Sequence, residues 1–203
     1  MTARPLKVAA VVLAAGRSSR MAPRNKLLEL VDHKPVITHV VNAALGSGAD
    51  PVIVVTGFEA ERIGEALRGL KVKVVHNADY AQGLNTSLRA GLKALMPNTD
   101  GAIILLGDMP QIQSGNLNAL IAALKDQESI CVPVRSGRRG NPLLWGARYF
   151  PEMMGISGDV GAKPLMANYL EHVVEVPINS DGIFADIDTT SQLARLRSKP
   201  SRS

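Results

Sequence analysis

The sequence predicts a three-layer α/β fold with a mostly parallel central sheet. Apolar runs rich in β-branched residues alternate with stretches of helical period, the pattern of strands joined by crossover helices. Hydrophobic residues make up 46% of the 203 residues and charged residues 20%, as in ordinary globular proteins. Because no linker or internal repeat divides the chain, we expect one domain over residues 1–198 and a disordered basic tail at 199–203.

Six apolar segments are the expected strands. They cover residues 8–14, 52–56, 72–76, 102–106, 130–134 and 173–177. Right-handed crossovers place the carboxyl ends of parallel strands, with the loops that follow them, along one edge of the sheet. Ligands bind at that edge in α/β proteins, so the loops after the strands are the places to look for function.

Six segments of helical period separate or follow these strands. They cover residues 35–45, 59–70, 86–95, 115–125, 162–169 and 190–197. Ser114 is a suitable N-cap for one of these helices, and Thr189 or Thr190 for the last.

Composition and charge limit the possible partners. The net charge is +5, but ten of the basic residues lie before residue 27 or after residue 188, leaving 13 bases and 18 acids elsewhere. This distribution, with only 3% aromatic residues, argues against nucleic-acid binding. The apolar run 8–15 is too short to span a membrane, and the single cysteine fits a reduced, cytoplasmic setting.

The loop after the first strand is rich in small, hydroxyl and basic residues. Residues 11–26 read VVLAAGRSSRMAPRNK. Main-chain N–H groups around Gly16, together with Arg20 and Lys26, would form a nest for a polyphosphate. The loop contains neither a P-loop nor a dinucleotide-binding fingerprint. Composition alone favours an ordinary solvated loop.

Two acidic elements follow apolar segments. Asp108 comes directly after an expected strand, and Asp186 and Asp188 flank Ile187, so that both carboxylates point to the side opposite Ile187. Asp108 and one of this pair could bind Mg²⁺, with water and phosphate oxygens completing its coordination. The alternative is structural, with these residues capping a turn or the last helix.

Several motifs resemble those of one known family. The string L-A-A-G-R-S-S-R-M, followed by Lys26, is similar to the signature loop of the molybdenum-cofactor nucleotidyltransferase-like (MobA-like) family. Five more strings occur in family order: G-L-N-T-S-L-R-A-G at 83–91, G-D-M-P at 107–110, R-G-N-P-L-L-W at 139–145, G-D-V-G-A at 158–162 and D-I-D-T at 186–189. The resemblance implies a Rossmann-like nucleotidyltransferase fold and nucleotidyl transfer.

The resemblance also implies residue roles. The implied catalytic residues are Arg20, Lys26 and Asp108. The implied nucleotide-binding residues are Leu13, Ala14, Ala15, Gly16, Arg17, Ser18, Lys26, Gly83, Asn85 and Ser87. The implied acceptor-binding residues are Asn141, Pro142, Asp159 and Gly161, and the implied metal ligands are Asp108, Asp188 and Asp186.

The first loop also suggests a nucleotide. Guanylyl-transferring members of the family typically have L-A-G-G, whereas this chain has Ala15 in the third place, as cytidylyl-transferring members do. We therefore expect CMP transfer from CTP to molybdopterin, with Mg²⁺ as cofactor and a molybdenum hydroxylase as a possible partner. Two positions depart from the family pattern: Ala22 replaces a glycine and Asn141 replaces a common histidine.

Three alternatives stay open. One is a guanylyltransferase of the same family, and another is a non-catalytic carrier or chaperone of the molybdenum cofactor. The third is an NAD-dependent oxidoreductase in which Glu59 reads the ribose, which the missing G-x-G-x-x-G makes less favourable.

Overall fold

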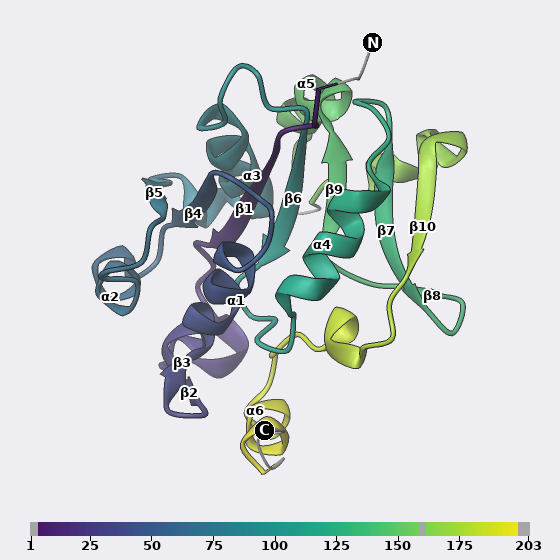
Figure 1. Cartoon of the computed structure of the whole chain (residues 1–203). Helices are drawn as coiled ribbons and strands as arrows, with labels where there is room; N and C mark the ends of the chain where they lie inside the picture. Colours follow the sequence, from purple (N-terminus) through teal and green to yellow (C-terminus); the bar gives the residue numbers. More distant parts are fainter. Residues whose placement is uncertain (1–3, 159–160, 199–203) are drawn as a thin grey trace.

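The chain was examined as a computed structural model, which describes residues 4–158 and 161–198. One sheet runs through the molecule, with strand order β10–β7–β9–β6–β1–β4–β5 and β8 paired to β7 (Figure 1). The strands are β1 Val8–Ala14, β4 Val52–Thr56, β5 Lys73–His76, β6 Gly101–Leu106, β7 Ile130–Arg135, β8 Arg138–Arg139, β9 Leu143–Gly146 and β10 Val173–Pro177. The tail at 199–203 lies outside the described residues.

The sheet is mostly parallel, as predicted. β1 is parallel to both of its neighbours, β4 and β6, and β10 is parallel to β7. β9 is antiparallel to β6 and β7, between which it lies. Its four residues, Leu143–Gly146, are all buried, and sequence analysis missed this strand. A run of four apolar residues after a turn is too short to show a period.

Helices cover both faces of the sheet. They are α1 Val36–Leu45, α2 Ala60–Ala66, α3 Leu84–Lys93, α4 Ser114–Ala123, α5 Phe150–Gly155 and α6 Thr190–Arg197. In Figure 1, α1 and α4 lie on the near face and α3 and α5 on the far face. The expected helix at 162–169 is wrong, because Lys163–Asn168 forms 3-10 turns. Gln113, rather than Ser114, is the N-cap of α4, whereas Thr189 caps α6 as expected.

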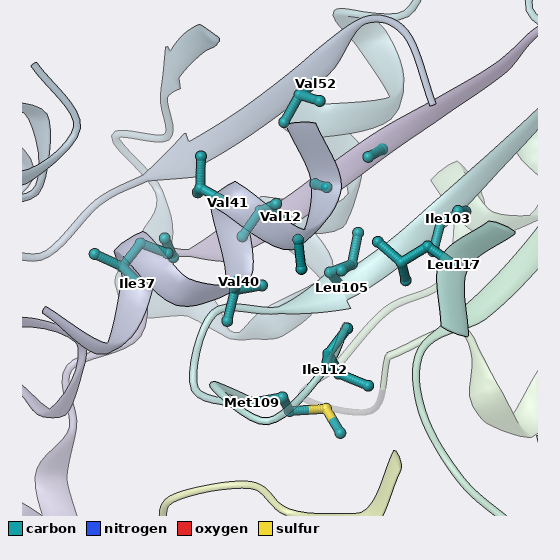
Figure 2. Packing of buried hydrophobic residues seen from close by; sticks show 14 of the residues in the cluster. Val12, Ile37, Val40, Val41, Val52, Ile103, Leu105, Met109, Ile112 and Leu117 are labelled. Atoms are coloured by element: carbon teal, nitrogen blue, oxygen red, sulfur yellow. The ribbon is translucent and has the colours of Figure 1, made fainter. Parts of the chain in front are cut away.

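Alternate residues of β1 pack on opposite faces of the sheet. Ala10, Val12 and Ala14 belong to the core under α1 and α4, whereas Val11 and Leu13 face α3. Figure 2 shows the α1 side of this core, where apolar side chains of α1, β1, β6 and α4 meet. Burial on both faces fixes the register of β1 and therefore the position of the loop after it.

A small hairpin and a long C-terminal segment complete the structure near the carboxyl edge of the sheet. The hairpin pairs β2 (Leu30–Val31) with β3 (Lys34–Pro35). After β10 the chain crosses this edge, the lower one in Figure 1, and ends in α6. None of the described helices is long and apolar enough to cross a membrane.

Candidate active site

The loop after β1 turns back on itself through hydrogen bonds of Ser18. This residue has a left-handed backbone, with φ of 52°. Its hydroxyl accepts a hydrogen bond from the Lys26 N–H at 3.2 Å, and the Asn25 side chain accepts one from the Leu27 N–H at 3.1 Å. The short 3-10 turn Lys26–Leu28 therefore returns to the end of β1 and places the Lys26 side chain at the carboxyl edge.

A cavity of about 360 Å³ opens beside this loop. The implied catalytic residue Asp108 lines it, as do eight of the implied nucleotide-binding residues: Leu13, Ala15, Gly16, Arg17, Ser18, Lys26, Gly83 and Ser87. Ala14 does not line it, because its methyl group packs in the core on the opposite face. Asn85 is also absent from the lining; its amide donates a hydrogen bond to the Gly158 carbonyl. The volume is at the lower end of the range for small-molecule sites.

Lys26, which lines this cavity, lies between two carboxylates. Its Nζ atom is 2.5 Å from Asp108 Oδ2 and 3.0 Å from Asp188 Oδ1. The other oxygen of Asp188 is 2.7 Å from the Arg20 guanidinium. A second cavity of about 270 Å³ adjoins the first and is lined by Lys26, Arg20 and Asp188 among others. The structure thus joins by ion pairs four of the five charged residues that the resemblance implied for catalysis and metal binding. The fifth, Asp186, lies near enough for its charge to act on Asp108.

The C-terminal segment reaches this cluster by pairing with the loop after β6. The Ile187 N–H donates a hydrogen bond to the Asp108 carbonyl at 3.0 Å, and the Ile187 side chain is fully buried. Its two neighbours, Asp186 and Asp188, are each partly exposed. Asp188 makes the two ion pairs described above, whereas Asp186 has no ion pair among those of the described residues.

The charges in the cluster shift one another's pKa values. Burial raises the pKa of Asp108 above its usual range, although Lys26 opposes the shift, and the nearby Asp186 charge adds to it. Burial disfavours the charged form of Lys26, but attraction to Asp108 and Asp188 outweighs it and raises the pKa of Lys26. Partial burial opposes ionisation of Asp188, yet Lys26 and Arg20 lower its pKa.

The donor set fits a divalent cation bound together with phosphate. Asp108 Oδ1 is buried and has no hydrogen-bond partner, so an acceptor oxygen is left unused beside a cationic group. Within residues 4–158 and 161–198, no group of three or more His, Cys, Asp or Glu side chains is arranged to hold a metal by itself. Mg²⁺ sites often use one or two carboxylates plus substrate phosphates, which matches Asp108 and Asp188.

The implied acceptor residues that the structure describes, Asn141, Pro142 and Gly161, are not among those that line either cavity. The Asn141 N–H donates to the Ile183 carbonyl at 2.9 Å, and Pro142 is buried after it. Gly161 lies beside Leu84, at the start of α3. Asp159 is outside the described residues. Leu84 lines the first cavity, so Gly161 lies next to the cavity wall.

Several wall residues were not anticipated from sequence, Tyr80 above all. The Tyr80 ring lines the cavity, and the Arg17 guanidinium lies 5.8 Å from its centroid. Phe58 packs against Tyr80, with the two ring centroids 6.5 Å apart. A single tyrosine ahead of the Gly83 turn gives no sequence signal that separates a cavity wall from the core.

Comparisons with known proteins agree with this architecture. A family model described as the MobA-like NTP transferase domain matches residues 10–173. The purine catabolism protein PucB of Bacillus subtilis is 32% identical over 92% of this chain and 94% of its own length. The GlmU protein of Pelobacter propionicus is 32% identical over 68% of this chain, but the chain spans only 30% of that protein.

Solved structures give the same result. A nucleotidyl transferase from Methanothermobacter thermautotroptrophicus is 30% identical, with a TM-score of 0.83 over 94% of this chain and 96% of its own. Rv0371c of Mycobacterium tuberculosis, solved as a manganese complex, is 27% identical, with a TM-score of 0.81 over 95% of this chain and 99% of its own. The chain belongs to the MobA-like NTP transferase family and is a nucleotidyltransferase with the Rossmann-like fold.

Proposed function

We propose that this protein transfers CMP from CTP to a phosphate-bearing acceptor of the molybdopterin type, with release of pyrophosphate. The observation that carries the proposal is the Lys26 ammonium group between Asp108 and Asp188, beside the cavity of about 360 Å³ that Lys26 and Asp108 help to line. A cavity of this size suits one nucleoside, and the charged cluster beside it suits the phosphates of the same molecule.

The chain's residues would act mainly by position and charge. The attacking phosphate and the triphosphate are both anions, so bringing them together in line is a large part of the barrier. Lys26 and Arg20 would reduce this repulsion and stabilise the pyrophosphate as it leaves. No protein nucleophile is needed, since the acceptor phosphate is ionised at neutral pH.

Asp108 and Asp188 would hold the divalent cation, for which we propose Mg²⁺. When bound, such an ion neutralises charge on the phosphate oxygens and helps to orient them. Lys26 also neutralises charge on the same two carboxylates. The manganese complex of the Mycobacterium tuberculosis relative supports a divalent cation in this family.

The choice of CTP rests on Ala15. This residue lines the cavity, and its methyl group occupies space that a glycine would leave open. A narrower base pocket favours a pyrimidine over a purine. The acceptor assignment rests on the family alone, and a molybdenum hydroxylase is the partner that would receive the finished cofactor.

Pyrophosphate release tests the proposal. The purified protein would be assayed with CTP, GTP, ATP and UTP in Mg²⁺, each with and without molybdopterin. We expect release with CTP only when molybdopterin is present. Preference for GTP would identify a guanylyltransferase instead. Retention of molybdopterin with no release from any triphosphate, and no effect of Asp108→Ala on that retention, would identify a carrier.

A further inference from the structure

Arg197, the final residue of α6, binds the segment that joins the Lys26 turn to β2. Arg197 Nε donates a hydrogen bond to the Leu30 carbonyl at 2.7 Å, and the guanidinium also pairs with Glu29 Oε2 at 3.0 Å. Glu29 and Leu30 directly follow the 3-10 turn that carries Lys26. Figure 1 shows α6 beyond the lower edge of the sheet, on the side of the β2–β3 hairpin.

The first turn of the same helix holds Asp188. The N–H groups of Asp188 and Thr189 both donate to Gln192 Oε1 at 2.8 Å, and the Thr189 hydroxyl accepts from the Gln192 N–H at 3.2 Å. This reciprocal capping box fixes the backbone just before the helix begins. Leu193, in the middle of α6, is buried in the core. The position of Asp188 therefore depends on the placement of α6.

The segment 188–197, which contains α6, is thus joined at both of its ends to the segment 26–30. At one end Asp188 pairs with Lys26, and at the other Arg197 bonds to Glu29 and Leu30. A link at only one end would leave α6 able to pivot about Leu193. With both links in place, the separation between Asp188 and Lys26 depends on the placement of α6 as well as on their own part-buried ion pair and the Ile187–Asp108 backbone hydrogen bond.

We infer that Arg197 is a positioning residue that holds Asp188 in place for the divalent cation. The inference builds on the proposed role of Asp188 as a metal ligand. Arg197 touches neither Asp188 nor Lys26, and its guanidinium is 43% exposed, so its pair with Glu29 adds little to global stability. Its effect falls on the geometry of the carboxylate pair.

Manganese binding to the metal-free protein provides the test. Free Mn²⁺ would be measured by electron paramagnetic resonance during titration of the wild type, Arg197→Ala, Arg197→Lys and Arg195→Ala. Arg195 is an exposed residue of the same helix, so its variant matches the charge change without removing the bonds to Glu29 and Leu30. We expect Arg197→Ala to weaken Mn²⁺ binding severalfold, less than the roughly tenfold or greater loss that follows removal of a group bonded directly to a metal ligand, because Arg197 acts on Asp188 through α6. Arg197→Lys should restore part of the loss, and Arg195→Ala should bind as the wild type does.

A double variant separates positioning from general loosening. If Arg197 acts through Asp188, adding Arg197→Ala to Asp188→Asn should cause no further loss of Mn²⁺ affinity. The inference would be overturned if the two losses were additive or if Arg197→Ala had no effect on Mn²⁺ affinity. It would also be overturned if Arg195→Ala and Arg197→Ala had equal effects, or if Asp188→Asn bound Mn²⁺ normally. If Arg197→Ala fails to fold, Glu29→Gln removes only the charge partner and takes its place in the same scheme.

The outcome is independent of the nucleotide. A protein that prefers GTP, or one that releases no pyrophosphate, would contradict the proposed function. The Mn²⁺ pattern among the variants would still support or overturn the role of Arg197, because it requires neither nucleotide nor acceptor.

Discussion

At the scale of single residues, Asp108 experiences opposing effects. It is largely buried and has one oxygen without a partner, conditions that favour the neutral acid, while Lys26 at 2.5 Å favours the carboxylate. A buried carboxylate with an unused oxygen is costly for the folded protein, and such groups are common at functional sites. The residue is suited to receive a cation rather than to stabilise the fold.

The raised pKa of Asp108 predicts an acid limb in the pH profile. Because the carboxylate must be ionised to bind the cation, kcat/KM should fall as pH falls, at a pH above the ordinary aspartate value of about 4. Asp186→Asn removes a charge that adds to the shift, so its acid limb should move to lower pH. Pyrophosphate release across pH 4–8 checks both points. If the acid limb of Asp186→Asn lies at the same pH as that of the wild type, the group that titrates in this limb is not Asp108.

Ala15 gives a second prediction at this scale. Ala15→Gly should raise the kcat/KM for GTP relative to CTP by about tenfold, since one methyl group in a binding pocket is worth roughly that much discrimination. Ala14→Gly is the matched control, because the Ala14 methyl group packs in the core on the other face. Competition assays with the two triphosphates would measure the ratio. An equal change in both variants would mean that backbone flexibility, not pocket width, is responsible.

At the scale of elements, α3 depends on its close approach to the sheet. A Cβ atom on Gly91 would lie 2.4 Å from Val11 Cγ1 and 3.1 Å from Val55 Cγ2. The missing side chain lets the helix pack directly on β1 and β4. Because Gly83 and Ser87 at the start of α3 line the cavity, this contact also sets the distance between the two cavity walls.

Gly91→Ala should therefore affect both stability and binding. We expect a loss of about 1–3 kcal/mol in the free energy of unfolding from overpacking, together with weaker nucleotide affinity. Gly64→Ala is the control: Gly64 lies within α2, where an added methyl group meets nothing within 4 Å, and alanine should stabilise that helix by about 0.5–1 kcal/mol. Urea unfolding and calorimetric titration with CTP measure the two quantities. Normal CTP affinity in Gly91→Ala would show that the cavity does not depend on this contact.

The elements also show what could be predicted from sequence. The strands 8–14, 52–56 and 173–177 agree with the structure to the residue, because each is rich in valine or other β-branched residues, the side chains that favour strands. β9 was missed and the helix at 162–169 was wrong, since both are short and take their conformation from packing against neighbours. The meeting of Lys26 with Asp188 joins residues 162 positions apart, and only the family resemblance suggested it.

At the scale of the whole molecule, the two ends of the parallel strands differ in what they contribute: the carboxyl edge of the sheet carries the candidate site and the amino edge contributes to stability. The carboxyl edge carries the cavity and the charged cluster. The amino edge carries a tighter network, in which the buried Asp100 carboxylate accepts hydrogen bonds from Arg4 at 2.7 and 2.9 Å, the Lys7 N–H at 2.8 Å and Gln127 at 2.7 Å. These bonds join the chain before β1 to the starts of β6 and β7. Stability at one edge and chemistry at the other should therefore be separable.

Asp100→Asn tests this separation. Hydrogen bonding to Arg4 holds the pKa of Asp100 well below its usual range, so its contribution to stability is present above the unfolded pKa of about 4 and is lost as pH falls. We expect the variant to lose about 2–3 kcal/mol at pH 7, because an amide offers one acceptor oxygen to several donors. In urea unfolding at pH 3 the difference in the free energy of unfolding between the variant and the wild type should narrow.

Asp50→Asn is the control. Asp50 is exposed at the same edge of the sheet, so this variant should change the free energy of unfolding little at either pH. Since Asp100 lies at the edge opposite Lys26, the folded Asp100→Asn variant should keep its kcat; a reduced kcat at full folding would mean that the two edges are coupled through β1 and β6.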